Sequence, residues 1–253
     1  MIIVMILYLF LIGSVLGSFF NVVGIRVPRR ESIIRPRSHC SICKRNLTAA
    51  DLVPIFSYLF LKGKCRKCGT RISPLYPLVE AGTGLLFVAS FLVFGWTGEM
   101  IVSLVLMSML AIIFVSDIRY MIIPNKVLLF FAPLFLALRL VWIPLDPWWD
   151  ALVGAGIGFG LLLMIAVVSR GGMGGGDIKL FAVLGLVLGW QGTLLAFFFS
   201  CLFGALIGGV GLLVGKVERR KPIPFGPFIV LGTITAYFFG SILVEWYLSR
   251  FIF

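Results

Sequence analysis

The sequence predicts an all-α polytopic membrane protein, with about eight transmembrane helices and a small zinc-binding cytoplasmic insert. Of its 253 residues 60% are hydrophobic, against about 45–50% in soluble domains, and the mean hydropathy is +1.12. Four of the five cysteines fall in one charged stretch, residues 26–76. The net charge of +12 would suggest a nucleic-acid partner in a soluble protein. In a membrane protein it marks cytoplasmic loops, so no nucleic-acid partner is expected.

Eight apolar segments approach the length of about 20 residues that a membrane-spanning helix needs. They cover residues 2–25, 77–96, 100–116, 126–145, 148–168, 178–190, 193–215 and 226–247. The first has no basic residue before it and exceeds the apolar core of a signal peptide, about 7–15 residues, so we expect it to stay as a span. The sixth is short, but the alternation of charged loops favours it as a real span. The predicted domains are therefore the first helix (1–25), the insert (26–76) and a seven-helix core (77–253).

The positive charges predict the orientation. If 26–76 is cytoplasmic, the alternate loops 117–126, 169–179 and 216–225 lie on the same side, and these four stretches hold 20 of the 22 basic residues. Arg139 and Arg250 are the exceptions, near the outer face. Six tryptophans fall near outer helix ends, as interfacial anchors do: Trp96, Trp142, Trp148, Trp149, Trp190 and Trp246. We expect a multi-pass protein with both termini outside the cytoplasm.

The insert carries two C-x2-C pairs, Cys40 with Cys43 and Cys65 with Cys68, separated by 21 residues. This spacing is close to that of a structural zinc site with four thiolate ligands. Two disulfides are the alternative, but the charges place the insert in a reducing compartment. Neighbouring basic side chains would offset the charge of the thiolates: Lys44, Arg45, Lys64, Arg66 and Lys67. Anionic lipid headgroups are the expected neighbours of this basic insert, and Cys201, in the seventh span, is expected to be buried.

Acidic residues at a membrane edge are costly and therefore functional candidates. They are Glu80, Asp117, Asp177 and Glu245. Asp117 ends the third span in "FVSDIRYMIIPNK", and Asp177 follows the fifth in "RGGMGGGDIK". Both span ends lie on the cytoplasmic side, so the two carboxylates can meet and share one proton, which is aspartic-protease chemistry. The glycines would let a substrate backbone approach the acids.

Three other interpretations of these acids stay open from the residues alone. A transporter or proton-coupled channel would use them as a relay, but it predicts polar groups at the bilayer midplane. A scaffold that docks a partner through the zinc insert gives no reason for two acids at one depth. A solvated acid in a flexible loop would explain Asp177 alone, and the matching depth of Asp117 argues against it.

The chain resembles the type IV prepilin peptidases, also called leader peptidase and N-methyltransferase. The resemblance rests on "GMGGGDIK", "SDIRYMIIPN", the cysteine insert after "GSFFNVVGIRVPRR", "YPLVEAGTG" and "PIPFGPF". It covers nearly the whole length, although G-x-G-D alone is also found in presenilin-like proteases. It implies a bacterial inner-membrane enzyme that cleaves the basic leader of prepilins and pseudopilins after a glycine, on the cytoplasmic face.

The resemblance also implies residue roles. Asp117 and Asp177 would be the catalytic pair, and the four cysteines of the insert would bind the metal. Many such enzymes then methylate the new N-terminus with S-adenosylmethionine. Asn21, Arg26 and Glu80 are possible contributors to that step, with a polar interface role as the favoured alternative.

Overall fold

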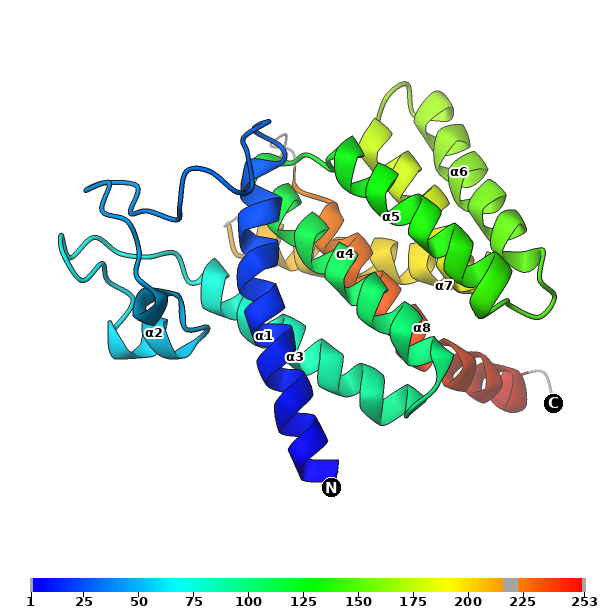
Figure 1. Cartoon of the computed structure of the whole chain (residues 1–253). Coiled ribbons are helices and arrows are strands. Elements are labelled where there is room, and N and C mark those ends of the chain that lie inside the picture. Colours follow the sequence, from blue (N-terminus) through cyan, green and yellow to red (C-terminus); the bar gives the residue numbers. More distant parts are fainter. Residues whose placement is uncertain (1, 216–222, 252–253) are drawn as a thin grey trace. The chain divides into compact units, whose positions relative to one another are not determined.

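The computed structural model describes residues 2–215 and 223–251, and in this part of the chain every regular element is a helix (Figure 1). The predicted all-α class is therefore confirmed. The chain divides into two compact units, Met1–Ser116 and Asp117–Phe253, which are described one at a time. The expected basic loop 216–225 lies largely outside the described residues.

Seven helices in the described residues are long and apolar enough to cross a membrane. They are α1 (Ile2–Arg26), α3 (Leu75–Phe94), α4 (Gly98–Tyr120), α5 (Asn125–Ala137) with its π-helical end η2 (Leu138–Trp142), α6 (Asp150–Val168), α7 (Gly175–Leu213) and α8 (Gly226–Phe251). Their ends agree with the predicted spans to within a few residues. Their outward faces carry many exposed apolar side chains, as helices in lipid do. The protein is thus a multi-pass membrane protein.

The difference between eight expected spans and seven helices lies in α7. This element has 39 residues and contains both the sixth and the seventh predicted span. Its backbone is non-helical at Gly189, with φ 69° and ψ −178°, which is left-handed geometry that glycine adopts readily. The rings of Phe181 and Phe197 are 5.9 Å apart, whereas a straight helix would separate these residues by about 24 Å. The chain therefore folds back at Gly189, and both predicted segments exist as separate helical halves.

Two charged side chains hold this break. Arg139 is 2% exposed, and its Nε and Nη2 donate to the carbonyl oxygen of Val187 at 3.1 and 2.9 Å. Asp150 Oδ1 accepts a hydrogen bond from the backbone N–H of Trp190 at 3.1 Å. A helix end leaves backbone groups without partners, which is expensive away from water. Arg139 and Asp150 thus satisfy the backbone on either side of Gly189.

In the first unit, glycines let α1 and α3 approach closely. A Cβ atom on Gly13 would lie 2.8 Å from the Cα of Gly84, and one on Gly17 would lie 2.9 Å from the Cα of Glu80. Gly13 and Gly17 are four residues apart, the spacing of small residues that membrane helices use for close packing. The short elements η1 (Ala49–Leu52) and α2 (Phe56–Phe60) belong to the insert between these helices.

The second unit uses the same device between α6 and α7. A Cβ atom on Gly154 would overlap the carbonyl oxygen of Gly185, and one on Gly158 would overlap that of Phe181. The six tryptophans predicted at helix ends are all exposed. The expectation for Cys201 was wrong: it is exposed on α7, because this position falls on an outward face of the helix.

Candidate active site and metal centre

Asp117 lies in the last turn of α4 and is 5% exposed. Its Oδ2 accepts a hydrogen bond of 2.7 Å from the backbone N–H of Gly226, the first residue of α8. A Cβ atom at position 226 would lie only 2.7 Å from the Cγ of Asp117. Glycine is therefore required there, because any side chain would collide with the carboxyl group. Sequence reasoning missed this contact, although "PIPFGPF" was part of the resemblance.

Asp177 is half-buried in the first turn of α7. The backbone N–H groups of this turn point toward the helix start, where the helix dipole favours negative charge. A Cβ atom on Gly174 would lie 2.9 Å from Oδ2 of Asp177. The glycine-rich sequence before α7 thus brings the protein's own bare backbone up to the carboxylate.

Asp117 and Asp177 lie close enough for their charges to interact. Two contacts hold the start of α7 against the segment that follows α4. A Cβ atom on Gly176 would lie 3.0 Å from the Cβ of Ile123, and Lys179 Nζ donates to Oδ1 of Asn125 at 3.1 Å. Helix packing therefore brings together two aspartates that are 60 residues apart in the sequence. Two adjacent carboxyl groups can act together as general base and general acid.

The four cysteines of the insert form a compact cluster. Their Sγ atoms all lie within 4.8 Å of one another, with 3.8 Å between Cys40 and Cys68 and 4.0 Å between Cys43 and Cys65. A tetrahedral zinc site with Zn–S bonds of about 2.3 Å needs S···S distances of about 3.8 Å. A disulfide would need about 2.05 Å, and all four cysteines are free. The cluster can hold a metal ion, and the donor set suits zinc.

The two cysteine pairs sit on turns of the same construction. In the first, the N–H of Cys40 donates to Arg45 O at 3.0 Å and the N–H of Lys44 donates to Cys40 O at 3.0 Å. In the second, Cys65 donates to Thr70 O at 2.8 Å and Gly69 donates to Cys65 O at 2.9 Å. Both turns point two sulfurs at one position.

The protonation of the sulfurs is uneven. The hydroxyl of Thr70, 3.2 Å away, lowers the pKa of Cys68 to about 6. The backbone N–H of Arg45 favours the thiolate of Cys43, but burial and the neighbouring sulfurs together raise its pKa to about 11. Neighbouring sulfurs thus oppose further ionisation, and a divalent cation would remove that opposition.

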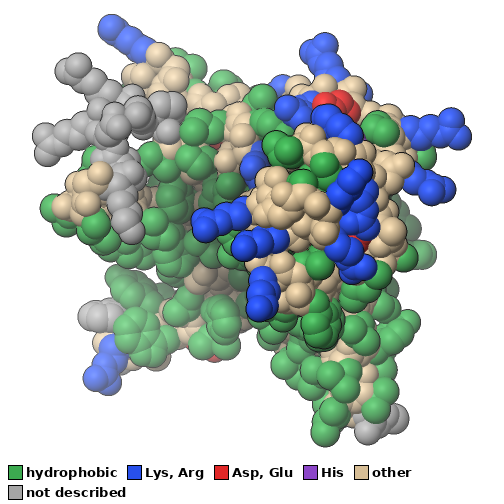
Figure 2. All heavy atoms as spheres, turned by 90° about the vertical axis from the view of Figure 1, so that its left-hand side faces the viewer, with side chains coloured by type: hydrophobic (Ala, Val, Ile, Leu, Met, Phe, Trp, Pro, Cys, Tyr) green, Lys and Arg blue, Asp and Glu red, His purple; other side chains and the backbone are tan. Residues whose placement is uncertain are grey.

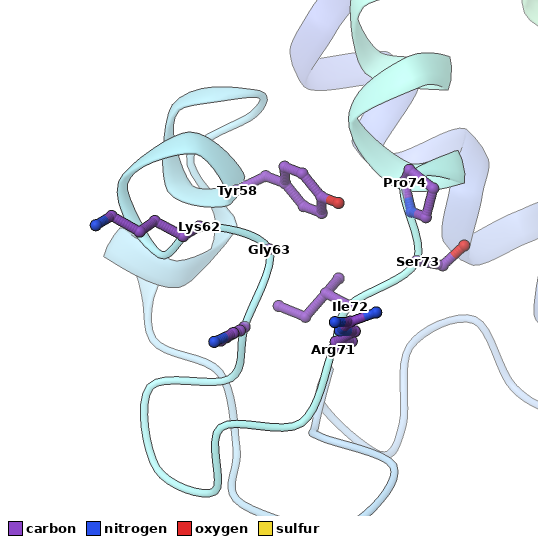
Figure 3. A pocket seen from close by; sticks show the side chains of 8 residues that line it. Tyr58, Lys62, Gly63, Arg71, Ile72, Ser73 and Pro74 are labelled. Carbon is purple, nitrogen blue, oxygen red and sulfur yellow. The ribbon is translucent and has the colours of Figure 1, made fainter.

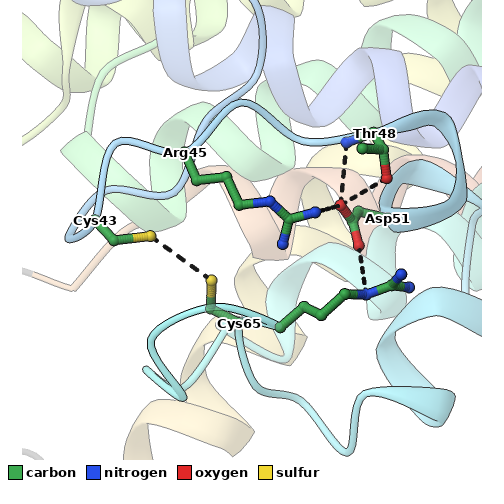
Figure 4. A network of polar contacts seen from close by, with 6 residues as sticks. Cys43, Arg45, Thr48, Asp51 and Cys65 are labelled. Atoms are coloured by element: carbon green, nitrogen blue, oxygen red, sulfur yellow. Dashed lines mark hydrogen bonds and ion pairs between the residues drawn. The ribbon is translucent and has the colours of Figure 1, made fainter.

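Asp51 bridges the two turns (Figure 4). Its Oδ2 accepts hydrogen bonds from the backbone N–H and hydroxyl of Thr48 at 3.0 and 2.8 Å and from Arg45 Nη2 at 2.7 Å. Arg66 Nε, beside the second pair, lies 3.2 Å from Oδ1. The Thr48 backbone and the two guanidinium groups hold the pKa of Asp51 below its ordinary value. Arg45 and Arg66 were expected to offset the thiolates, but they pair with this carboxylate.

Each of the three residues considered for methylation makes a hydrogen bond at the base of the insert, while Oδ1 of Asn21 is buried and has no partner among the described residues. Asn21 Nδ2 donates to Tyr76 O at 3.2 Å, and Arg26 Nη1 donates to Ser32 O at 3.0 Å. Glu80 Oε2 accepts from the N–H of Ile55 at 2.8 Å. These contacts fit the favoured alternative, in which the residues brace the insert against α1 and α3.

Comparisons with known proteins agree with this architecture. Residues 11–94 match the family model described as bacterial peptidase A24 N-terminal domain, and residues 104–209 match that of the type IV leader peptidase family. A Bacillus subtilis protein named prepilin leader peptidase/N-methyltransferase is 48% identical over 95% of this chain and 97% of its own length. A Myxococcus xanthus protein of the same name is 41% identical over 84% of this chain and 65% of its own length. One from Aeromonas salmonicida is 34% identical over 96% of this chain and 94% of its own length.

No solved structure matches the chain. The two family models together cover most of its length, and each takes in one of the two features built above: the cysteine cluster lies in the first match and both aspartates lie in the second. The resemblance stated from the sequence is therefore confirmed, and the chain belongs to the type IV leader peptidase family.

Proposed function

We propose that this protein cleaves the basic leader peptide of prepilins and pseudopilins, with Asp117 and Asp177 as the catalytic pair. The observation that supports the proposal is that the two carboxyl groups, at the ends of α4 and α7, lie close enough for their charges to interact. Bare glycine backbone lies against each of them, at Gly226 and Gly174. The names of the relatives supply the substrate class.

In the proposed mechanism the pair shares one proton. The ionised carboxylate takes a proton from a water molecule, whose oxygen attacks the scissile carbonyl carbon while the protonated partner donates to the carbonyl oxygen. The tetrahedral intermediate then breaks its C–N bond, and the leaving amine takes a proton from the pair. The N–H of Gly226 fixes the rotation of the Asp117 carboxyl group by binding Oδ2, so Oδ1 is the oxygen that can face water and substrate.

We further propose that the cysteine cluster binds one structural Zn²⁺, since four thiolates fill a tetrahedral site and leave no position for substrate. Methylation of the new N-terminus is proposed from the names of the relatives, with the sulfonium methyl of S-adenosylmethionine as the transferred group. Asn21, Arg26 and Glu80 each make a hydrogen bond within the protein, although Oδ1 of Asn21 is buried without a partner in the described part of the chain. None of the three is assigned to that cofactor.

The proposed orientation has both termini outside and the ends of α4 and α7 that carry the aspartates at the cytoplasmic face of the inner membrane. It rests on the loop charges, because 20 of the 22 basic residues fall in alternate loops. Thiol-blocking reagents that cannot cross membranes test it in intact cells. Labelling of a cysteine introduced at position 126 without permeabilisation would contradict this orientation.

The first experiment is cleavage of a synthetic prepilin-like peptide by the purified protein, read by mass spectrometry with and without S-adenosylmethionine. Asp117→Asn and Asp177→Asn are each expected to lower kcat about 10³-fold or more, because loss of either group removes general acid–base catalysis worth about 10²–10⁴-fold. Asp146→Asn, at an exposed aspartate of the second unit, is the control and should keep full activity. More than a tenth of the wild-type kcat in either test variant would refute the pair.

A further inference from the structure

A hollow of about 620 Å³ opens on the insert beside α2, where the chain returns to α3. Tyr58 projects over it, with its hydroxyl directed toward Ser73 and Pro74, while Arg71 lies at its lower edge (Figure 3). Gly63 makes this arrangement possible: its φ is +65°, and a Cβ atom there would lie 2.9 Å from the phenol oxygen. The Tyr58 hydroxyl has no hydrogen-bond partner within the described part of the chain.

The hollow is bordered by positive charge alone. Its cations are Lys62, Lys64 and Arg71, and none of them forms an ion pair with a described residue. The two acids of the insert, Glu31 and Asp51, are already paired with arginines elsewhere. Lys and Arg side chains gather over this side of the protein (Figure 2). The hollow therefore favours an anionic ligand, and S-adenosylmethionine, whose net charge is positive, suits it poorly.

The surface next to the hollow is strongly apolar. Phe56, Leu59 and Phe60, all on the single turn of α2, are 51%, 63% and 83% exposed. Apolar side chains of this size beside basic ones are typical of segments that lie in a membrane interface. The same surface in water would cost free energy in proportion to its apolar area.

The depth of this surface is set by α3. The N–H of Ile55, which precedes α2, donates to Glu80 Oε2 at 2.8 Å, and Glu80 is the sixth residue of the membrane-spanning helix. Pro74, in the wall of the hollow, directly precedes the first residue of α3. The hollow and α2 therefore lie level with the first turns of a membrane helix, which is where lipid headgroups and upper acyl chains are found.

We propose that the hollow and α2 together bind an anionic phospholipid of the membrane. The phosphate lies between Lys64, Arg71 and the hydroxyl of Tyr58, and the acyl chains lie along Phe56 and Phe60. This lipid ties the metal-binding insert to the membrane surface. No residue of the hollow or of α2 belongs to the aspartate pair, and the proposal does not depend on the proposed cleavage.

The test is native mass spectrometry of the full-length protein in detergent, titrated with phosphatidylglycerol and, separately, with phosphatidylcholine. The wild type should prefer phosphatidylglycerol. Lys64→Gln with Arg71→Gln should weaken phosphatidylglycerol binding about 30-fold, since each cation near an anionic headgroup contributes about a factor of five. Arg35→Gln with Arg37→Gln removes the same charge from exposed positions of the insert and should change it less than about threefold.

Phe60→Ser tests the apolar half, and it should weaken lipid binding while leaving the metal content at one ion per chain. Metal content also verifies that the charge variants keep a folded insert. Equal affinity for the two lipids would overturn the proposal, as would unchanged binding in the Lys64/Arg71 variant. Displacement of the lipid by excess inorganic phosphate would identify a free-anion site instead, and displacement by S-adenosylmethionine would identify a cofactor site.

Discussion

Replacement of Gly226 by alanine should disable the Asp117 carboxyl group without unfolding the protein. The new Cβ atom would lie 2.7 Å from the Cβ, Cγ and Oδ2 atoms of Asp117. An ordinary van der Waals contact begins at about 3.4 Å, so the carboxyl group must move by about 0.7 Å or the start of α8 must retreat by as much. Both movements lengthen the hydrogen bond from the N–H of Gly226, now 2.7 Å.

A misplacement of about 1 Å at a catalytic group can lower the rate about 10²-fold. We therefore expect kcat for leader-peptide cleavage to fall between about 30- and 100-fold. Overpacking of this size destabilises a protein by about 1–3 kcal/mol, which lowers the thermal midpoint in detergent without preventing folding. Cleavage is followed by mass spectrometry at saturating peptide, so that kcat and not KM is compared.

Gly240→Ala, in the same helix α8, is the matched control. A Cβ atom there would lie 3.5 Å from Cδ1 of Leu195, which is an ordinary contact. Gly240 also lies several turns along α8 from Gly226, the residue that contacts Asp117. Its kcat should equal that of the wild type. Wild-type kcat in Gly226→Ala, or an equal loss in Gly240→Ala, would show that the approach of Gly226 to the carboxyl group does not matter for catalysis.

Two further substitutions test the supports of the fold. Asp51→Asn removes the charge that joins the two cysteine turns, including a charged hydrogen bond to Arg45 worth about 1.5–3 kcal/mol. We expect this variant to lose its bound metal to a competing chelator at about one-tenth of the chelator concentration that the wild type requires. Glu31→Gln, at an exposed ion pair, is the control and should hold the metal as the wild type does. Arg139→Met leaves the Val187 carbonyl without its buried donor, at a cost of about 1–3 kcal/mol. The thermal midpoint of the Arg139→Met variant should fall by several degrees, while Arg250→Met, at an exposed arginine, should leave the midpoint unchanged. Equal midpoints for Arg139→Met and the wild type would refute the capping role of Arg139.

Sequence reasoning located the aspartates and cysteines because each depends on short-range patterns. The cysteine cluster follows from C-x2-C spacing, in which each turn brings two sulfurs together regardless of the rest of the chain. The aspartates were found because a charge beside a long apolar run has few explanations other than function. The meeting of Asp117 and Asp177 followed from counting spans, since an even number of crossings returns the chain to the same side.

The contacts that sequence reasoning missed join residues far apart in the chain. Gly226 and Asp117 are 109 residues apart, and nothing in either neighbourhood indicates the other. Arg139 was expected near the outer face, with no role, yet it is buried and caps the chain at Val187. Its partner is a backbone carbonyl, which leaves no trace in side-chain patterns.

The sequence by itself thus determined the membrane class, the candidate metal ligands and the candidate acids. Apolar length, ligand spacing and charge distribution act locally and are written along the chain. Only the tertiary structure decided that α7 folds back at Gly189, that Asp51 joins the two cysteine turns through Arg45 and Arg66, and that a glycine seats the Asp117 carboxyl group. These features depend on how closely distant backbones can pack, and that distance is set by the shape of all the side chains between them.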